Sequence, residues 1–155
     1  MPTVRLETTI NAPIEVCFDL ARNVEAHCET TSGTQERAVA GVTTGLIGPN
    51  DEVTFEAVHF GVRQRLTARI VEYEWPFRFV DEMITGAFKS LVHIHEFEDR
   101  NGYTLMTDTL TWTSPLGPIG MLADKLLLES HMRRFLIDRN AAMKRIAERH
   151  VASSP

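Results

Sequence analysis

The sequence predicts a single α+β domain in which a seven-stranded antiparallel sheet wraps around a long C-terminal helix. Seven short segments alternate apolar and polar side chains, and six of them follow one another at the spacing of hairpins. Residues 116–150 instead repeat apolar side chains at helical spacing. With 155 residues, 43% apolar and 24% charged, the chain has the size and composition of one domain with a sizeable core.

The first elements are a strand and two short helices. Residues 3–10 alternate strictly between apolar or small and charged or polar side chains, as a half-buried strand should. Asn11 can cap a helix that carries Pro13 in its first turn, because proline needs no hydrogen bond there. A second short helix is predicted at 24–29.

Six further strands are predicted at 34–41, 51–59, 62–73, 77–84, 87–98 and 103–113. Pairing His59 with Val62 across a two-residue turn fixes the register of the first hairpin. It places Phe55 opposite Leu66 and Ala57 opposite Gln64 on the inner face, and Glu56 opposite Arg65 and Glu52 opposite Arg69 on a charged outer face.

A second hairpin turns through Asp-Arg-Asn-Gly at 99–102. The predicted pairs are Phe97 with Thr104, His95 with Met106, His93 with Asp108, and Leu91 with Leu110. The apolar inner face therefore carries two histidines and an aspartate.

The final helix is predicted to start near Pro118 and to run for about 30 residues, or roughly 45 Å. Its apolar side includes Ile119, Leu122 and Leu126 in the first turns. The domain is predicted to span residues 1–150, with 151–155 as a disordered tail.

Charge and hydropathy limit the classes of partner. The net charge is −5, yet residues 116–155 carry seven basic and four acidic side chains, against nine and seventeen in residues 1–115. Because the basic groups are mixed with acidic ones, we interpret this segment as a solvated helix face and predict no nucleic-acid partner. No apolar run approaches the ~20 residues of a transmembrane segment, and the N-terminus lacks the layout of a signal peptide, so a cytoplasmic protein is expected. Cys17 and Cys28 are expected to be reduced thiols.

Four stretches carry a resemblance to a known superfamily: INAPIEVCFDLARNVEAH at 10–27, HFGVRQRLTARI at 59–70, GAFKSLVHIHEFED at 86–99 and TLMTDTLTWTSPLGPIGMLADKLLLE at 104–129. Together with the element order, they resemble the START-like or SRPBCC superfamily, and in particular its polyketide cyclase/dehydrase-like and ligand-binding members. The resemblance implies a helix-grip fold with an internal cavity for hydrophobic ligands such as lipids, hormones or aromatic polyketides. A Rieske-type cysteine and histidine cluster, a glycine-rich phosphate loop, a GxSxG elbow and an HExxH helix are all missing from the sequence.

His93 and His95 lie two residues apart on one strand and therefore share a face. Asp108 opposite His93 can orient the imidazole and, unless burial outweighs the pairing, raise its pKa. Three roles stay open: a hydrogen-bonded structural pair, orientation of a ligand, or general acid and base catalysis by His93 and Asp108.

The predicted ligand-binding residues are Phe55, Gln64, Leu66, Phe79, Asp81, Leu91, His93, His95, Met106, Asp108, Leu110, Trp112, Leu122 and Leu126. A metal site of His93, His95 and Asp108 with His59 or Asp81 has suitable donors, but only the HxH spacing is local, so no metal or other cofactor is predicted.

The predicted function is binding of a hydrophobic small molecule, lipid-, polyketide- or aromatic-like, between the sheet and the final helix. Two alternatives stay open: a polyketide cyclase or dehydratase that uses the His93 and Asp108 pair, and a protein or membrane interaction module with a solid core. The sequence leaves the oligomeric state undetermined.

Overall fold

The computed structural model describes residues 1–123 and 127–153. Seven strands form one antiparallel sheet in the order β1-β7-β6-β5-β4-β3-β2. The strands are β1 (Thr3–Ile10), β2 (Arg37–Gly41), β3 (Glu52–His59), β4 (Val62–Glu74), β5 (Arg78–Thr85), β6 (Ser90–Asp99) and β7 (Thr104–Thr113). The helices are α1 (Ile14–Ala21), α2 (Val24–Thr30), the 3-10 turn η1 (Ser32–Thr34), α3 (Gly117–Ala123) and α4 (Glu129–Ser153).

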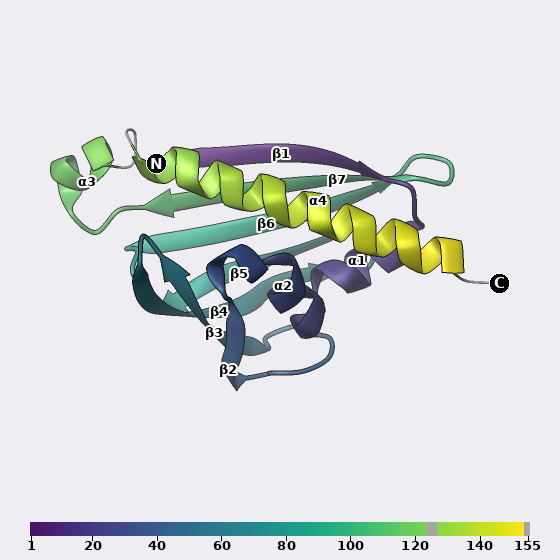
Figure 1. Ribbon diagram of the computed structural model, residues 1–155, viewed down its shortest axis with the longest axis horizontal. Helices are drawn as coiled ribbons and strands as arrows, with labels where there is room; N and C mark the ends of the chain where they lie inside the picture. Colours follow the sequence, from purple (N-terminus) through teal and green to yellow (C-terminus); the bar gives the residue numbers. More distant parts are fainter. Residues whose placement is uncertain (124–126, 154–155) are drawn as a thin grey trace.

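The long helix α4 lies across one face of the sheet, and α1 and α2 lie on that same face (Figure 1). The predicted α+β architecture is therefore confirmed.

The helix starts differ from the prediction in one detail. Pro13, not Asn11, is the N-cap of α1, and it provides no side-chain cap. Asn23 caps α2 instead, since its Oδ1 accepts a hydrogen bond from the Ala26 amide at 2.8 Å.

The register predicted for the β3–β4 hairpin is confirmed at every pair, from Glu52 with Arg69 to His59 with Val62. The register predicted for β6 and β7 is wrong by two residues, because His95 pairs with Asp108 and Leu91 with Trp112. The turn lies one residue later in the chain than predicted. Asn101 and Gly102 both adopt positive φ, which gives a two-residue loop. A shift of two residues leaves every side chain on the same face of the sheet, so the prediction of which side chains face inward still holds.

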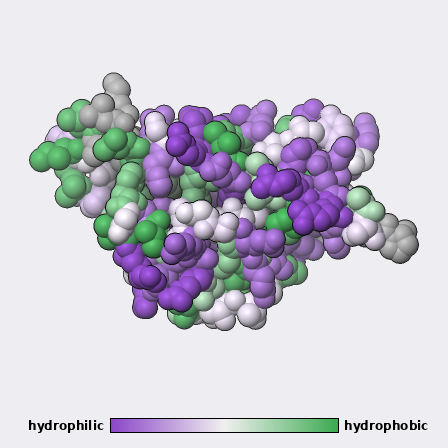
Figure 2. Space-filling view, in the orientation of Figure 1, coloured by the Kyte–Doolittle hydropathy of each residue, from purple (hydrophilic) through white to green (hydrophobic). Residues whose placement is uncertain are grey.

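The structure describes two helical stretches in the C-terminal segment, where one helix was predicted, and residues 124–126 between them lie outside the described residues. α3 ends at Ala123, α4 begins at Glu129, and Figure 1 shows α3 beyond the end of the sheet. Ile119 and Leu122 are exposed on α3, and hydrophobic side chains gather there in Figure 2. Helical spacing shows which side chains share a face, but not whether that face meets the sheet. At the other end, α4 continues through residues 151–153, which were predicted to belong to a disordered tail.

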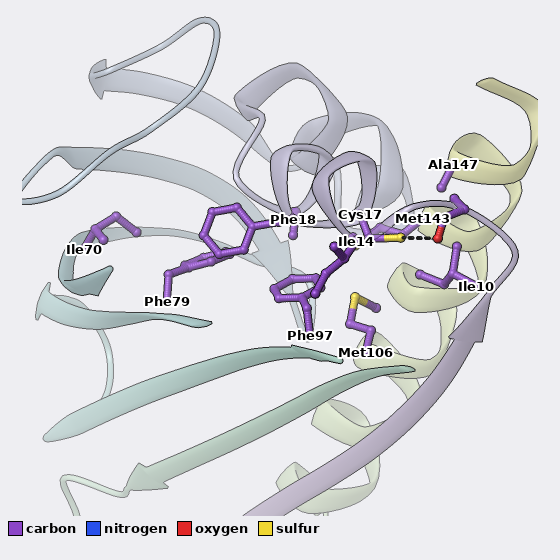
Figure 3. Packing of buried hydrophobic residues seen from close by; sticks show 12 residues of the cluster. Ile10, Ile14, Cys17, Phe18, Ile70, Phe79, Phe97, Met106, Met143 and Ala147 are labelled. Carbon is purple, nitrogen blue, oxygen red and sulfur yellow. Dashed lines mark hydrogen bonds between the residues drawn. The ribbon is translucent and has the colours of Figure 1, made fainter. Parts of the chain in front are cut away.

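The solid part of the core lies between α1, the sheet and the C-terminal half of α4. Phe18 of α1 packs edge-on against Phe79 and Tyr73, with ring centroids 5.2 Å and 5.5 Å apart. Figure 3 shows Phe18 pointing toward Phe79 and Phe97 of the sheet. A second cluster joins Trp112 to Leu136 at the other end of α4. Among the helices of the described residues, none is both long and apolar enough to cross a membrane.

Candidate ligand-binding site

A cavity of about 310 Å³ lies between the sheet and the N-terminal half of α4. Met132, Phe135 and Leu136 of α4 line one side of it. The sheet contributes these predicted binding residues: Phe55, Gln64, Leu66, Asp81, Leu91, His93 and Leu110. The structure therefore brings half of the predicted set together around one mostly apolar space.

The other predicted binding residues do not line this cavity. Phe79, Met106 and Trp112 are buried in the packed core, since Phe18 and the α4 side chains fill the space above them. Leu122 lies exposed on α3, and Leu126 falls outside the described residues. His95 and Asp108 are buried among the side chains beside the cavity. A second cavity of only about 60 Å³ touches Phe79 and His95.

Sequence reasoning missed a polar pair that joins the sheet to α4 at the wall of the cavity. His59 Nδ1 lies 2.9 Å from His131 Nε2, and both side chains line the cavity. Burial lowers the pKa of each of the two histidines. A signal for His131 was present, because it precedes the cavity residue Phe135 by one helical turn.

His27 and Glu36 form a second missed pair, with Nε2 and Oε1 2.9 Å apart. Burial would raise the pKa of Glu36, but the charge and hydrogen bond of His27 outweigh it and the pKa is lowered. These two residues come from α2 and the segment before β2, so nothing in the strand alternation predicts them.

Six side chains form what we call the inner polar cluster: Asp81, His93, His95, Asp108, Arg139 and Asn140. Asp108 is its centre and is fully buried. His93 Nε2 lies 2.9 Å from Asp108 Oδ1, and Asn140 Nδ2 donates to Oδ2 at 2.8 Å. His95 Nε2 lies 2.8 Å from Asp81 Oδ2. His95 Nδ1 lies 3.0 Å from Asp108 Oδ1, which is ion-pair distance without the alignment of a hydrogen bond.

The ionisable groups of this cluster shift one another's pKa values. Burial would raise the pKa of Asp108, but contacts with His93 and His95 and the charge of Arg139 outweigh it, and the pKa lies well below its usual range. For His95, burial lowers the pKa, yet contacts with Asp108 and Asp81 produce a net rise. The carboxylates of Asp81 and Asp108 thus favour the protonated form of His95, and Asp108 also faces the guanidinium of Arg139.

Asp108 was expected to raise the pKa of His93 unless burial outweighed the pairing, and here burial does outweigh it. Burial and the charge of the neighbouring His95 lower this pKa to about 4, despite the contact with Asp108. His93 is therefore neutral near pH 7. Because an ionised carboxylate can only accept, His93 donates from Nε2 and keeps a lone pair on Nδ1. No hydrogen-bond partner for Nδ1 occurs among the described residues.

Comparisons with known proteins agree on the fold. Neither a protein-family model nor a curated protein sequence matches the chain. The structure is similar to TTHA0849 from Thermus thermophilus, with a TM-score of 0.79, 22% identity and coverage of 99% of this chain and 100% of that chain. It is also similar to the Zhui aromatase/cyclase from Streptomyces sp. R1128, with a TM-score of 0.79, 14% identity and 99% of both chains covered. Ara h 8.0201 matches with a TM-score of 0.65 and 14% identity over 94% of this chain and 97% of that chain.

The chain has the helix-grip fold of START-like (SRPBCC) proteins. The identities are low enough that the similarity shows the fold alone, so any chemistry has to be argued from the side chains.

Within this helix-grip fold, the inner polar cluster offers donors for a metal, because donor atoms of Asp81, His93 and His95 lie within 4.8 Å of one another. Cys17 offers none, since it is buried in the packed core and burial raises the pKa of its thiol.

Proposed function

We propose that the protein binds a hydrophobic small molecule in the cavity between the sheet and α4. The cavity itself carries the proposal: its volume of about 310 Å³ is that of roughly ten water molecules at about 30 Å³ each. That volume lies at the small end of the usual range for ligand sites. A lipid-, polyketide- or aromatic-like molecule of modest size fits it. An interaction module with a solid core does not account for this space.

The polar groups on the wall give the ligand an orientation. His93 and Asp81 lie at one part of the lining and the His59 and His131 pair at another, with leucine and phenylalanine side chains around them. The free lone pair of His93 Nδ1 accepts a hydrogen bond, so a ligand with a hydroxyl group satisfies it. We therefore infer an apolar ligand that carries at least one hydrogen-bond donor.

A binding titration with 2-naphthol, an aromatic alcohol, tests this function. The wild-type protein should bind the probe saturably at one site. Ala57→Phe fills the cavity from β3 and should weaken binding at least tenfold, whereas the same substitution at the exposed Ala40 should leave it unchanged. Absence of saturable binding, or equal binding by a folded Ala57→Phe variant, contradicts the proposal. Native mass spectrometry of the purified protein checks independently for a retained ligand.

A second candidate function is catalysis in the same cavity, as a polyketide cyclase or dehydratase. The observation in its favour is the 2.9 Å contact that orients His93, a cavity residue, against Asp108. The structural similarity to an aromatase/cyclase supports it at the level of the fold. If His93 moves a proton, His93→Ala should cut turnover of a polyketide-like substrate by about 100-fold with binding largely kept. A change in affinity with no turnover by either protein favours binding alone.

A further inference from the structure

Three members of the inner polar cluster have the donor types of a transition-metal site. Two imidazoles and one carboxylate suit divalent ions such as Zn²⁺ or Co²⁺. The donor atoms of Asp81, His93 and His95 lie within 4.8 Å of one another, so that modest side-chain adjustments bring them to the spacing of ligands on one ion. We propose that these three residues form a site for a divalent transition-metal ion, with Asp108 as the outer carboxylate that holds both imidazoles.

The position of Asp108 supports this assignment. A histidine that binds a metal through one ring nitrogen usually presents the other to a carboxylate or carbonyl oxygen. Asp108 Oδ1 lies 2.9 Å from His93 Nε2 and 3.0 Å from His95 Nδ1. One carboxylate oxygen therefore holds His93 by a hydrogen bond and lies at ion-pair distance from the ring of His95. His93 Nδ1 and His95 Nε2 remain as the nitrogens available to a metal.

Asp108 is itself held in place from the helix side. Asn140 Nδ2 donates to its Oδ2 at 2.8 Å, and Arg139 Nη1 lies 3.5 Å from its Oδ1. Both helix residues are buried. An outer carboxylate with these partners keeps the two imidazoles oriented before an ion arrives, which lowers the cost of binding.

The third ligand, Asp81, is already beside one of the two nitrogens. Its Oδ2 lies 2.8 Å from His95 Nε2. Two neighbouring ligands on one zinc ion, each about 2.1 Å from it, are roughly 3.0–3.4 Å apart. A small movement of Asp81 therefore lets an ion replace the proton between these two groups. The Asp81 side chain is 27% exposed and lines the cavity, which leaves room for that movement.

The cavity supplies both the entry path and the open coordination position. Asp81 and His93 line it, whereas His95 and Asp108 lie behind them. Three protein ligands leave at least one position of a tetrahedral ion for water or for a small molecule in the cavity. The site does not need the proposed apolar ligand, because the cluster alone provides the donors, and an ion at His93 Nδ1 takes the place of the ligand hydroxyl there.

Titration of the chelator-treated, full-length chain with Co²⁺ tests the site, read by visible absorption and by calorimetry. We expect one ion per chain and an absorption spectrum of a four- or five-coordinate ion with nitrogen ligands. Asp81→Asn and His93→Gln should each weaken binding at least 100-fold. Asp108→Asn should weaken it about 10- to 100-fold, as expected for an outer partner, and leave the spectrum recognisable.

His131→Gln is the matched control, since it replaces another cavity histidine outside the three ligands. It should leave Co²⁺ binding unchanged. The proposal is overturned if the wild type binds no stoichiometric Co²⁺, if Asp81→Asn and His93→Gln bind as the wild type does, or if His131→Gln loses binding equally. In those cases only hydrogen bonds and ion pairs connect the side chains of the cluster, and no metal ion does. Because 2-naphthol is absent from this titration, its outcome is separate from that of the ligand-binding proposal.

Discussion

The two ends of the space between the sheet and α4 are filled differently. At the C-terminal half of α4, Phe18 from α1 packs between Phe79, Phe97 and Tyr73 and leaves a solid core. At the N-terminal half no such side chain is inserted among the described residues, and the cavity lies there against Met132 and Phe135. The same inner sheet face thus forms a core or a binding site according to what covers it.

The inner polar cluster lies at the boundary between these two ends. His95 stacks on Phe79, with ring centroids 4.2 Å apart and planes at 15°, and so belongs to the solid end. His93, whose ring centroid is only 3.7 Å from that of His95, lines the cavity. A charged network at this position can be buried on one side and open to a ligand on the other.

Removal of the C-terminal helices should have the largest effect on both ends. A chain truncated before Leu116 loses Leu136 and Met143, which are fully buried, and Met132, which is nearly so. Burial of each is worth about 1.5–3 kcal/mol, so the three together approach the ~5–15 kcal/mol stability of a whole domain. We expect no cooperative thermal transition by circular dichroism. A cooperative transition would mean that the sheet is stable without its cover.

Single large-to-small substitutions should separate the two ends. Phe18→Ala removes a fully buried ring from the solid core and should destabilise the protein by about 3–5 kcal/mol in chemical denaturation. Leu91→Ala removes a partly buried side chain that already borders empty space, and should cost only about 1 kcal/mol. Equal costs at the two positions would show that the cavity end is packed as tightly as the core.

The polar cluster should show the same contrast between its buried and open members. Asp108→Asn leaves Arg139 buried without its counter-charge and His95 with Asp81 alone, and should cost about 3 kcal/mol. Asp81→Asn, whose side chain is partly exposed to the cavity, should cost about 1 kcal/mol. Urea denaturation of both variants measures the difference. A larger loss at Asp81 would reverse the assignment of the buried and open sides.

The sequence predicts which side chains share a face of the sheet, but not which elements cover that face. Alternation with period two places Leu66 and Leu91 inside, and it keeps His93 and Asp108 on one face even after a two-residue error in register. Alternation cannot distinguish Phe79, which Phe18 covers, from Phe55, which borders the cavity. That distinction depends on the docking of α1, a contact between segments far apart in the chain.

Of the remaining errors, one is local and the others again depend on how the sheet is covered. The tight turn at Asn101 and Gly102 follows from two residues that tolerate positive φ, and the Asn-Gly signal for it was present in the sequence. The position of α3 beyond the end of the sheet and the contact between His59 and His131 depend on where the C-terminal helices lie on the sheet. Periodicity reports the face of a helix and not its position.

The smallest expected effect concerns the outer face of the sheet, where charge is balanced at the solvent boundary. Glu56 is buried there beneath Arg37, Arg63 and Arg65, with contacts of 2.7–3.0 Å. Hydrogen bonds from Arg37, Arg63 and Arg65 lower the pKa of Glu56 to about 2. Because all three arginines are more than half exposed, solvent screens their attraction, and the contribution to stability should be small compared with that of Asp108.

The sign of the pH dependence follows from that lowered pKa. A carboxylate with a depressed folded-state pKa stabilises the protein fully above its ordinary pKa of 4.5, and the stabilisation disappears as the pH falls toward about 2. The stability difference between wild type and Glu56→Gln should therefore shrink over this window and also shrink in high salt at neutral pH. Denaturation curves from pH 6 to pH 2 measure it. If the stability difference between wild type and Glu56→Gln stays constant with pH and salt, Glu56 stabilises the protein by packing and not by its charge. In that case only burial distinguishes the charges of the outer face from those of the inner polar cluster.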